Sequence, residues 1–246
     1  MTVSLLAQRQ TDALAIRVQE MPPGTVLDPR RPIGRAAWSS LAFALRNSAA
    51  KRLDIDQSEL QVGLAPAQRE GSPIGGLFLA DSLDNGAGYA SAIKSDIGPL
   101  MNGIDSFLKS VHSSDEALCD SSCHLCIRDH LNWPWHALLD WRLAVDLASV
   151  LLGETFDKFP FDPMARASLE KMAPEFQSEF REIAGIPSLL GRSGKTVAFV
   201  HPFADVRPEF APDGIGQARA AAPGLQFSTI FDMAREPQRV FQQLLS

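Results

Sequence analysis

The feature that most limits how this chain can fold is a stretch of eight residues, CDSSCHLC at 119–126, which contains all three of its cysteines. Three thiols this close together are typical of a disulfide with one thiol left over, a redox-active pair, part of a zinc site, or three ligands of an iron–sulfur cluster. The stretch is otherwise polar, so three buried apolar side chains explain it poorly. Each remaining arrangement implies a different class of protein.

The start of the chain argues against an oxidising compartment. MTVSLLAQRQTDALAIRVQE has no apolar run between a basic start and a cleavage site, so we expect no signal peptide. The longest apolar stretch, LAVDLASVLLG, is too short to cross a bilayer and contains Asp146. We therefore predict a cytoplasmic protein, in which a structural disulfide is unfavourable.

Cys123 and Cys126 form a CxxC pair, which in a redox protein should open a helix directly after a strand. Here the preceding residues, VHSSDEAL, are more typical of a loop or a helix end, and a redox pair leaves Cys119 unexplained. We therefore favour a metal site.

A structural zinc ion normally has four ligands in tetrahedral geometry, so three cysteines need a partner. The nearby histidines are His112, His124, His130 and His136. At about 100° per residue, a helix that starts near Pro134 places His136 and Asp140 on its apolar, core-facing stripe. We predict His136 as the fourth ligand, with Asp140 holding its other ring nitrogen. The alternatives are a ligand role for His130 and a His136–Asp140 pair that only serves the core, while Asn132 is expected to cap the helix.

The spacing Cys-x3-Cys-x2-Cys also matches the radical S-adenosylmethionine enzymes, in which three thiolates hold a [4Fe–4S] cluster. Members of that family usually carry an aromatic residue where this chain has Leu125. Their motif also follows the first strand of a large barrel, whereas 120 residues follow Cys126 here. An iron–sulfur enzyme is therefore the alternative to the zinc site.

Segments typical of strands and of helices alternate along the chain, which favours an α/β fold with a mixed sheet flanked by helices. We predict a single domain over residues 1–246, with a cysteine-bearing insertion at about 112–136 that a zinc ion ties down ahead of a helix. The expected strands are ALAIRVQ, ELQVGLAP, IGGLFLAD and KTVAFVHPF. The expected helices cover 36–52, the residues after the turn at Asp84–Gly86, the residues from about Pro134, and roughly 164–184, and the tail from Gly214 should form helix, strand and helix.

The net charge of −6 and the pI near 5.4 exclude attraction of nucleic acid by the whole surface. Contact with nucleic acid would need local basic patches. The candidates are Arg30, Arg31 and Arg35 in a loop, and Arg46, Lys51 and Arg52 near the end of the next helix. Taken alone, each patch is more typical of an ordinary solvated helix face or basic loop than of a nucleic-acid contact.

Three further motifs are weaker signals. GRSGKT at 191–196 lacks the first glycine of a phosphate-binding loop and precedes a strand, so we predict a turn and no ATPase site. His201 and Asp205 would suit an acid–base pair or a structural role. LADSLDNGAGYA could offer backbone amides to a phosphate, or its glycines could serve only a tight turn.

Four stretches in combination resemble a known family: AAWSSLAFALRNSAAKRLDIDQSEL, GLFLADSLDNGAGYA, CDSSCHLCIRDHLN and HALLDWRLAVDLA. They are similar to the C-terminal region of DrmB-like proteins of the DISARM anti-phage system, which belongs to the MrfA-like zinc-binding domain family. The resemblance runs through nearly the whole chain. It implies structural Zn²⁺ and work on DNA beside a superfamily 2 helicase. MrfA-type members supply four cysteines, of which this chain matches Cys119, Cys123 and Cys126 and has Asn132 near the fourth, while the DrmB-like pattern continues to His136.

In such proteins this region normally ends a much longer polypeptide, whereas this sequence starts with a methionine. We therefore expect a separate, non-catalytic module that works in trans with a DrmA-like helicase subunit, which would supply ATP hydrolysis. The complex would engage DNA, and the basic residues of this chain would help to place it. A pure protein–protein scaffold without nucleic-acid contact is the remaining alternative.

Overall fold

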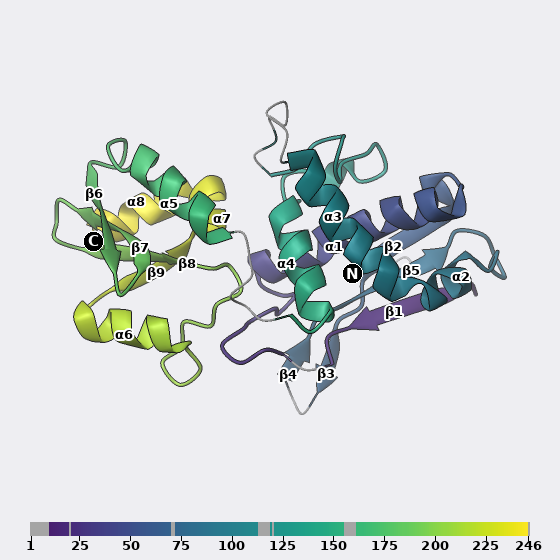
Figure 1. Ribbon diagram of the computed structural model, residues 1–246, viewed down its shortest axis with the longest axis horizontal. Helices are drawn as coiled ribbons and strands as arrows, with labels where there is room; N and C mark the ends of the chain where they lie inside the picture. The colour runs from purple at the N-terminus through teal and green to yellow at the C-terminus, as the bar shows by residue number, and fades with distance from the viewer. Residues whose placement is uncertain are drawn as a thin grey trace, which may run out of the picture. The chain divides into compact units, whose positions relative to one another are not determined.

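The computed structural model describes residues 10–19, 21–69, 72–112, 119, 121–154 and 161–245, without the side chains of 68, 69, 72, 73, 112 and 161–164. Two compact units make up the chain, where the sequence predicted one domain. The first takes in Met1–Gln19 and Leu27–Thr155, and the second takes in Glu20–Val26 and Phe156–Ser246 (Figure 1). Each unit has its own sheet and helices, and the mixed α/β fold class is confirmed.

The first unit contains a three-stranded antiparallel sheet of order β1-β5-β2. The strands are β1 (Ala13–Arg17), β2 (Leu60–Leu64) and β5 (Gly76–Asp81). β5 lies in the centre, which explains why GLFLAD is apolar almost throughout and nearly all buried. A separate small hairpin pairs β3 (Ala67–Arg69) with β4 (Ser72–Ile74). The predicted strands ALAIRVQ, ELQVGLAP and IGGLFLAD are thus confirmed.

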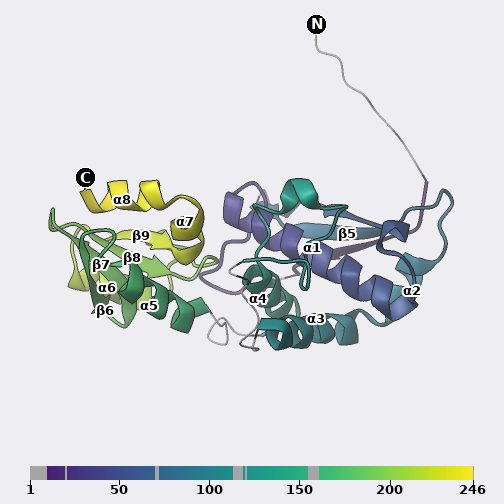
Figure 2. The same cartoon turned by 90° about the horizontal axis from the view of Figure 1, so that it is seen from above.

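The long helix α1 (Pro32–Leu53) forms the centre of the first unit. It packs against β2 and β5, and also against the helices α3 (Ile97–His112) and α4 (Trp141–Leu151) (Figure 2). Trp38 of α1 is fully buried and donates its Nε1–H to the Leu27 carbonyl at 3.1 Å. A Cβ atom on Gly75 would lie 1.9 Å from that Nε1, so only glycine lets the chain pass the indole ring.

The turn between β5 and α2 (Tyr89–Ser95) is closed by the carboxylate of Asp81, which is fully buried. Its two oxygens accept backbone N–H groups of Ala87, Tyr89 and Ala90 at 2.6, 3.1 and 2.8 Å. These are the amides that a phosphate would need at this helix N-terminus. The side chain of Asp81 occupies them already, so the turn is structural.

The helix expected from about Pro134 differs from the prediction. Trp133–Trp135 forms one turn of 3-10 helix, and α4 begins only at Trp141, with Asp140 as its N-cap. His136 therefore precedes α4 and does not share a helical stripe with Asp140. Asn132 stands at the start of the short turn without a side-chain capping bond, because its side chain is used within the loop.

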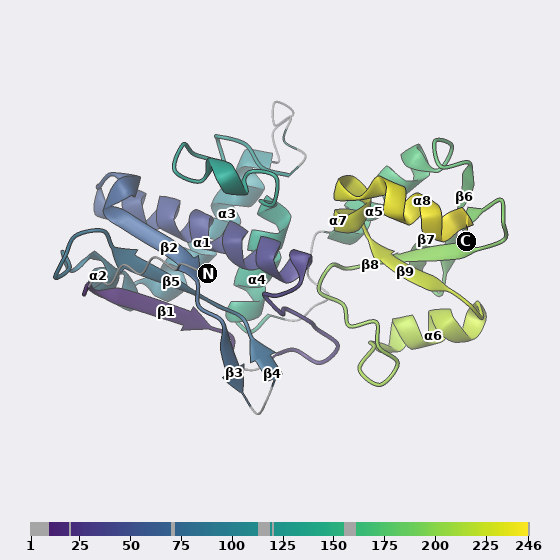
Figure 3. The ribbon, with the colours of Figure 1, turned by 180° about the vertical axis from the view of Figure 1, so that it is seen from behind.

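The second unit has a four-stranded sheet of order β6-β7-β8-β9, antiparallel except for the parallel pair β8 and β9. The strands are β6 (Ser178–Ile183), β7 (Ile186–Gly191), β8 (Thr196–Val200) and β9 (Gln226–Thr229). The helices are α5 (Phe161–Met172), α6 (Asp213–Ala221), α7 (Ile230–Arg235) and α8 (Pro237–Leu245). Leu169 of α5 and Val240 and Leu244 of α8 share a buried core with the sheet, and α6 lies apart from them (Figure 3).

The predictions for the second unit are confirmed except at one element. The strand in KTVAFVHPF, the turn at GRSGKT and the helix, strand and helix of the tail are present. The helix expected over 164–184 ends at Met172, and SEFREI forms β6 instead. Half-buried and exposed residues alternate along much of this strand, which fits an edge position in the sheet.

Candidate metal centre

The three cysteines come together at one point of the loop that leads to α4. Their sulfur atoms all lie within 4.8 Å of one another, and Cys126 is buried while Cys119 and Cys123 are half-buried. The Sγ of Cys126 lies 3.5 Å from that of Cys123 and 4.0 Å from that of Cys119. A disulfide needs about 2.05 Å, so these are free thiols. Thiolates around one tetrahedral zinc ion, with Zn–S near 2.3 Å, stand about 3.8 Å apart, and the cysteine triad fits that spacing.

A tight turn over Cys123–Arg128 places two of these thiols. The carbonyl of Cys123 accepts the backbone N–H groups of Cys126 and Arg128 at 3.1 and 3.0 Å. In the other direction, the N–H of Cys123 donates to the Sγ of Cys126 at 3.0 Å. An amide that points at sulfur favours its thiolate form, which is the form that binds a metal ion.

The thiols also influence one another electrostatically. Burial, with the nearby Cys126 sulfur, raises the pKa of Cys119, and burial raises the pKa of Cys126. Burial acts in the same direction on Cys123, but hydrogen bonds from the Cys126 thiol and the Leu125 backbone outweigh it, so its pKa is lowered. Three thiolates this close repel one another, and a soft divalent cation would remove that repulsion.

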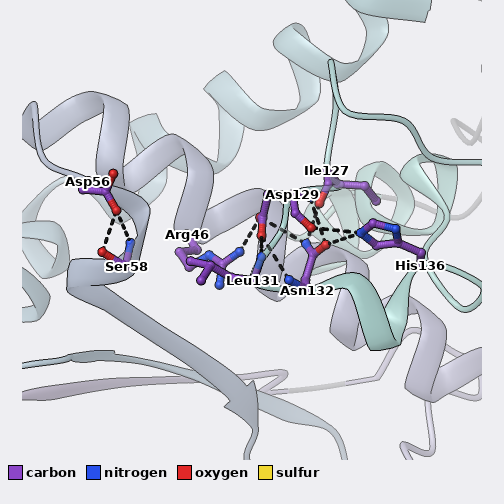
Figure 4. Close-up of polar contacts among 8 residues, drawn as sticks. All are labelled: Arg46, Asp56, Ser58, Ile127, Asp129, Leu131, Asn132 and His136. Atoms are coloured by element: carbon purple, nitrogen blue, oxygen red, sulfur yellow. Dashed lines mark hydrogen bonds and ion pairs between the residues drawn. The ribbon is translucent and has the colours of Figure 1, made fainter.

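His136 is held by a polar network that the loop itself supplies (Figure 4). Its Nε2 lies 2.8 Å from the Asn132 Oδ1 and 3.0 Å from the Asp129 carbonyl oxygen. Both partners are acceptors, because Asn132 uses its Nδ2 to donate to Ile127 at 2.8 Å. Nε2 therefore carries the proton in neutral His136, and Nδ1 is the nitrogen that keeps a lone pair for a metal ion.

Among the described residues, the only group of side chains close enough to share one metal ion is the cysteine triad. Neither ring nitrogen of His136 belongs to that group, so the structure does not bring the predicted fourth ligand together with the three thiols, and a ligand role for His136 stays a prediction. His130 is exposed and lies near Asp56, and the exposed His124 contacts the His136 ring edge to face at 5.8 Å between centroids. The side chain of His112, residues 113–118 and Asp120 are outside the described residues.

Asp140 was predicted to hold the second ring nitrogen of His136. In the structure its side chain accepts from the N–H of Arg142 and pairs with that guanidinium at 3.0 Å. The Asp129 carbonyl and Asn132 hold the histidine ring instead. A role for Asp140 beside a metal ion stays a prediction.

Arg46 was predicted as a surface cation, and the structure corrects this. Its side chain is 5% exposed and forms an ion pair with Asp129, which is 11% exposed. Asp129 also accepts the N–H groups of Leu131 and Asn132 at 2.7 and 3.1 Å. Arg46 therefore fastens the loop that contains the cysteines and leads to α4, here called the metal-binding loop (residues 119–140), to α1. Its guanidinium is not available to a DNA phosphate. Sequence reasoning missed the link because its two ends are 83 residues apart.

The other predicted nucleic-acid contacts lie at the two ends of α1. Arg30, Arg31 and Arg35 are exposed at its N-terminal end, where Arg30 is 70% exposed and pairs with Asp28 at 2.8 Å. Lys51 and Arg52 are exposed in its last turn. A helix of 22 residues is about 33 Å long, so these are two separate patches.

The candidate acid–base pair of the second unit is engaged in local contacts. The Nδ1 of His201 accepts the backbone N–H of Phe203 at 3.0 Å, and the carboxylate of Asp205 binds the guanidinium of Arg207. Both side chains thus support the structural alternative. Within the part of the chain that is described, no helix is long and apolar enough to cross a membrane.

Comparison with known proteins places the cysteine triad in a family context. Residues 41–127 match a family model described as MrfA Zn-binding domain. The match begins in α1 and ends directly after Cys126, so it includes all three thiols. This segment of the chain is thus similar to a zinc-binding domain. The family model covers about a third of the sequence, all of it within the first unit.

Parts of two larger proteins also match this chain. Druantia protein DruE of Escherichia coli (strain UMEA 4076-1) is 26% identical over 221 residues, which cover 83% of this chain and 12% of that protein. The crystal structure of the DUF1998 helicase MrfA bound to DNA matches 41% of this chain and 12% of its own chain, at 13% identity and a TM-score of 0.32. That score is too low to support any argument about fold. The chain thus spans a small part of both proteins, and the specific resemblance to DrmB stays a prediction.

Proposed function

We propose that this chain is a zinc-binding, non-catalytic accessory component of an anti-phage defence or DNA-processing complex. The observation that carries the proposal is the cysteine triad, whose sulfur spacings of 3.5 and 4.0 Å fit one zinc ion, inside the segment that matches the MrfA Zn-binding domain. Cys119, Cys123 and Cys126 would hold the ion, with His136 as the fourth ligand. The ion would cross-link the loop ahead of α4 and so keep its surface rigid.

The defence context and the partner rest on relatives. DruE is named as a Druantia protein, and MrfA is described as a helicase bound to DNA. The resemblance to DrmB-like proteins adds DISARM as a candidate system. We infer a superfamily 2 helicase subunit, DrmA-like in the DISARM case, as the partner in trans that hydrolyses ATP.

Metal content tests the zinc site directly. We expect about one zinc per chain and no visible absorption band in protein purified without air or chelators. Cys123→Ser should lose the metal and melt at a lower temperature. Leu125→Ala should keep the metal and the wild-type melting temperature, because Leu125 lies in the same turn but is 75% exposed. A brown protein with several irons per chain would instead establish the iron–sulfur alternative.

The role in DNA engagement is tested in the assembled complex. Replacing Arg30, Arg31 and Arg35 with glutamine should weaken binding of the helicase complex to DNA and lower its salt dependence, because exposed arginines act by neutralising phosphates. Replacing Arg181, Arg192 and Arg239, three exposed arginines of the second unit, with glutamine removes the same number of charges and is the matched control. If the complex binds DNA equally well without this chain, the result favours the alternative in which this chain is a protein–protein scaffold without nucleic-acid contact.

A further inference from the structure

A groove of about 550 Å³ lies between α1 and α3 in the first unit. Its floor and walls are largely apolar, formed by side chains such as Leu100, Ile104, Phe107 and Leu108 of α3 and Ala44 of α1. One end reaches Cys126. A space of this size is in the range that proteins use for specific binding.

The shape of the groove suits a second backbone. Gly103, in the middle of α3, lines it, and a Cβ atom built on Gly103 would meet nothing within 4 Å. A glycine inside a helix costs stability, and here no close packing of the described residues requires it. The lining residues of α3 run from Pro99 to Leu108, which corresponds to about 14 Å of helix. That length matches about two and a half turns of an amphipathic helix laid along the groove.

The charged residues at the mouth of the groove indicate whether a ligand should carry positive or negative charge. Arg52 and Asp96 pair with each other at 2.9 Å and so cancel. Lys51 lies 4.4 Å from the centre of the Phe107 ring and has no carboxylate partner among the described residues. The Oδ1 of Asn47, on the groove wall, is buried without a hydrogen-bond donor in the described parts of the chain. The groove therefore offers one net positive charge and one acceptor that lacks a donor.

We propose that this groove is a docking site for an acidic amphipathic helix of a partner protein. Its apolar side chains would fill the groove over Gly103, a carboxylate would pair with Lys51, and a polar N–H group would reach Asn47. A nucleic acid fits less well, because its binding relies on several cations and the groove has a single unpaired one. The proposal does not rest on the zinc or DNA roles above, although it shares Cys126 with the zinc site and Lys51 with the predicted nucleic-acid contacts.

Peptide selection on the full-length, metal-loaded protein tests the proposal. A phage-displayed library of helical peptides of about 16 residues is selected on the wild-type protein and depleted on Gly103→Trp. This variant fills the groove while replacing a poor helix former, so its melting temperature should not fall. We expect enriched peptides with apolar residues at spacings of three and four and an excess of Asp and Glu. No enrichment, or peptides that bind Gly103→Trp equally well, would overturn the proposal.

Charge reversal then tests the role of Lys51. Lys51→Glu should weaken binding of the enriched peptides roughly fivefold, as the loss of an exposed ion pair predicts. Lys94→Glu reverses another exposed charge, in the last turn of α2 and outside the groove, and should leave peptide binding unchanged. Peptides insensitive to Lys51→Glu would contradict the acidic partner. Displacement of the peptides by single-stranded oligothymidylate, with loss of its binding in Gly103→Trp, would assign the groove to nucleic acid instead.

Discussion

At the scale of single residues, the metal-binding loop depends on a few buried polar side chains that carry no metal. Asn132 is fully buried and joins Ile127, Asp129 and His136. Asp129 in turn pairs with Arg46 of α1. The positions of the cysteines and of His136 therefore rest on contacts with a residue far away in the sequence.

Breaking the Arg46–Asp129 pair should destabilise the protein strongly. Arg46→Gln leaves the Asp129 carboxylate buried without its counter-charge, and we expect the free energy of unfolding to fall by about 3 kcal/mol. Urea unfolding of the zinc-loaded protein measures this. Arg52→Gln is the matched control, because the pair with Asp96 is exposed and its loss should cost at most about 1 kcal/mol. Equal effects of the two substitutions would contradict the role given to Arg46.

The sequence predicted the cysteines of the candidate site correctly, but not the residues around them. CDSSCHLC alone predicted the cysteine triad, because ligands seven residues apart are brought together by a local turn. The arrangement of His136 and Asp140 was misplaced, since a helical stripe was assumed through residues that form a 3-10 turn and an N-cap. Arg46 gave no signal, because a basic residue near a helix end is usually solvated.

Among the elements of the first unit, two glycines differ in the space around them: a Cβ atom would clash at one position and meet open space at the other. Gly75 allows the chain to pass the buried indole of Trp38, while Gly103 of α3 faces the open groove. The two positions should therefore respond in opposite ways to an added methyl group.

Gly103→Ala should raise the free energy of unfolding by about 0.5–1 kcal/mol, because alanine loses less backbone entropy in a helix. Gly75→Ala should lower it by about 1–3 kcal/mol, because Trp38 must shift to make room. Chemical unfolding of both variants checks this pair. A loss of stability in Gly103→Ala would mean that the groove is closed in solution.

Elements with a clear period were predicted well. The apolar run of β5 and the helical spacing in α1 gave the right structure at nearly the right residues. The error at β6 followed from residues 164–184, where α5 and a strand of alternating exposure were merged into one helix. A turn at Ala173–Gln177, with Gln177 at positive φ, separates them, and Pro174 within this turn is the signal that should have ended the predicted helix.

At the scale of the whole molecule, the chain divides into two units although no linker stands out in its composition. Residues 20–26 belong with the second unit. The chain therefore passes from the first unit to the second after Gln19, returns at Leu27, and passes to the second unit again after Thr155. Such an arrangement has no local sequence signal. All four tryptophans and all three cysteines belong to the first unit.

This distribution allows each unit to be followed separately when zinc is removed. Chelation should lower the temperature at which tryptophan fluorescence reports unfolding, because every tryptophan lies in the unit that contains the cysteine triad. Hydrogen exchange in β7 and β8 of the second unit should stay slow at temperatures below that transition. Equal loss of protection in β7 and β8 would show that the two units unfold together.

The compactness of the cysteine triad in the sequence has a thermodynamic consequence. Because Cys119 and Cys126 are seven positions apart, the unfolded chain can also wrap its thiolates around a metal ion. A bound ion stabilises a protein only by the ratio of its affinities for the folded and unfolded chains. Tight zinc binding and a large gain in stability are therefore separate quantities here. The difference between them measures what the folded protein adds through Arg46, Asp129, Asn132 and His136.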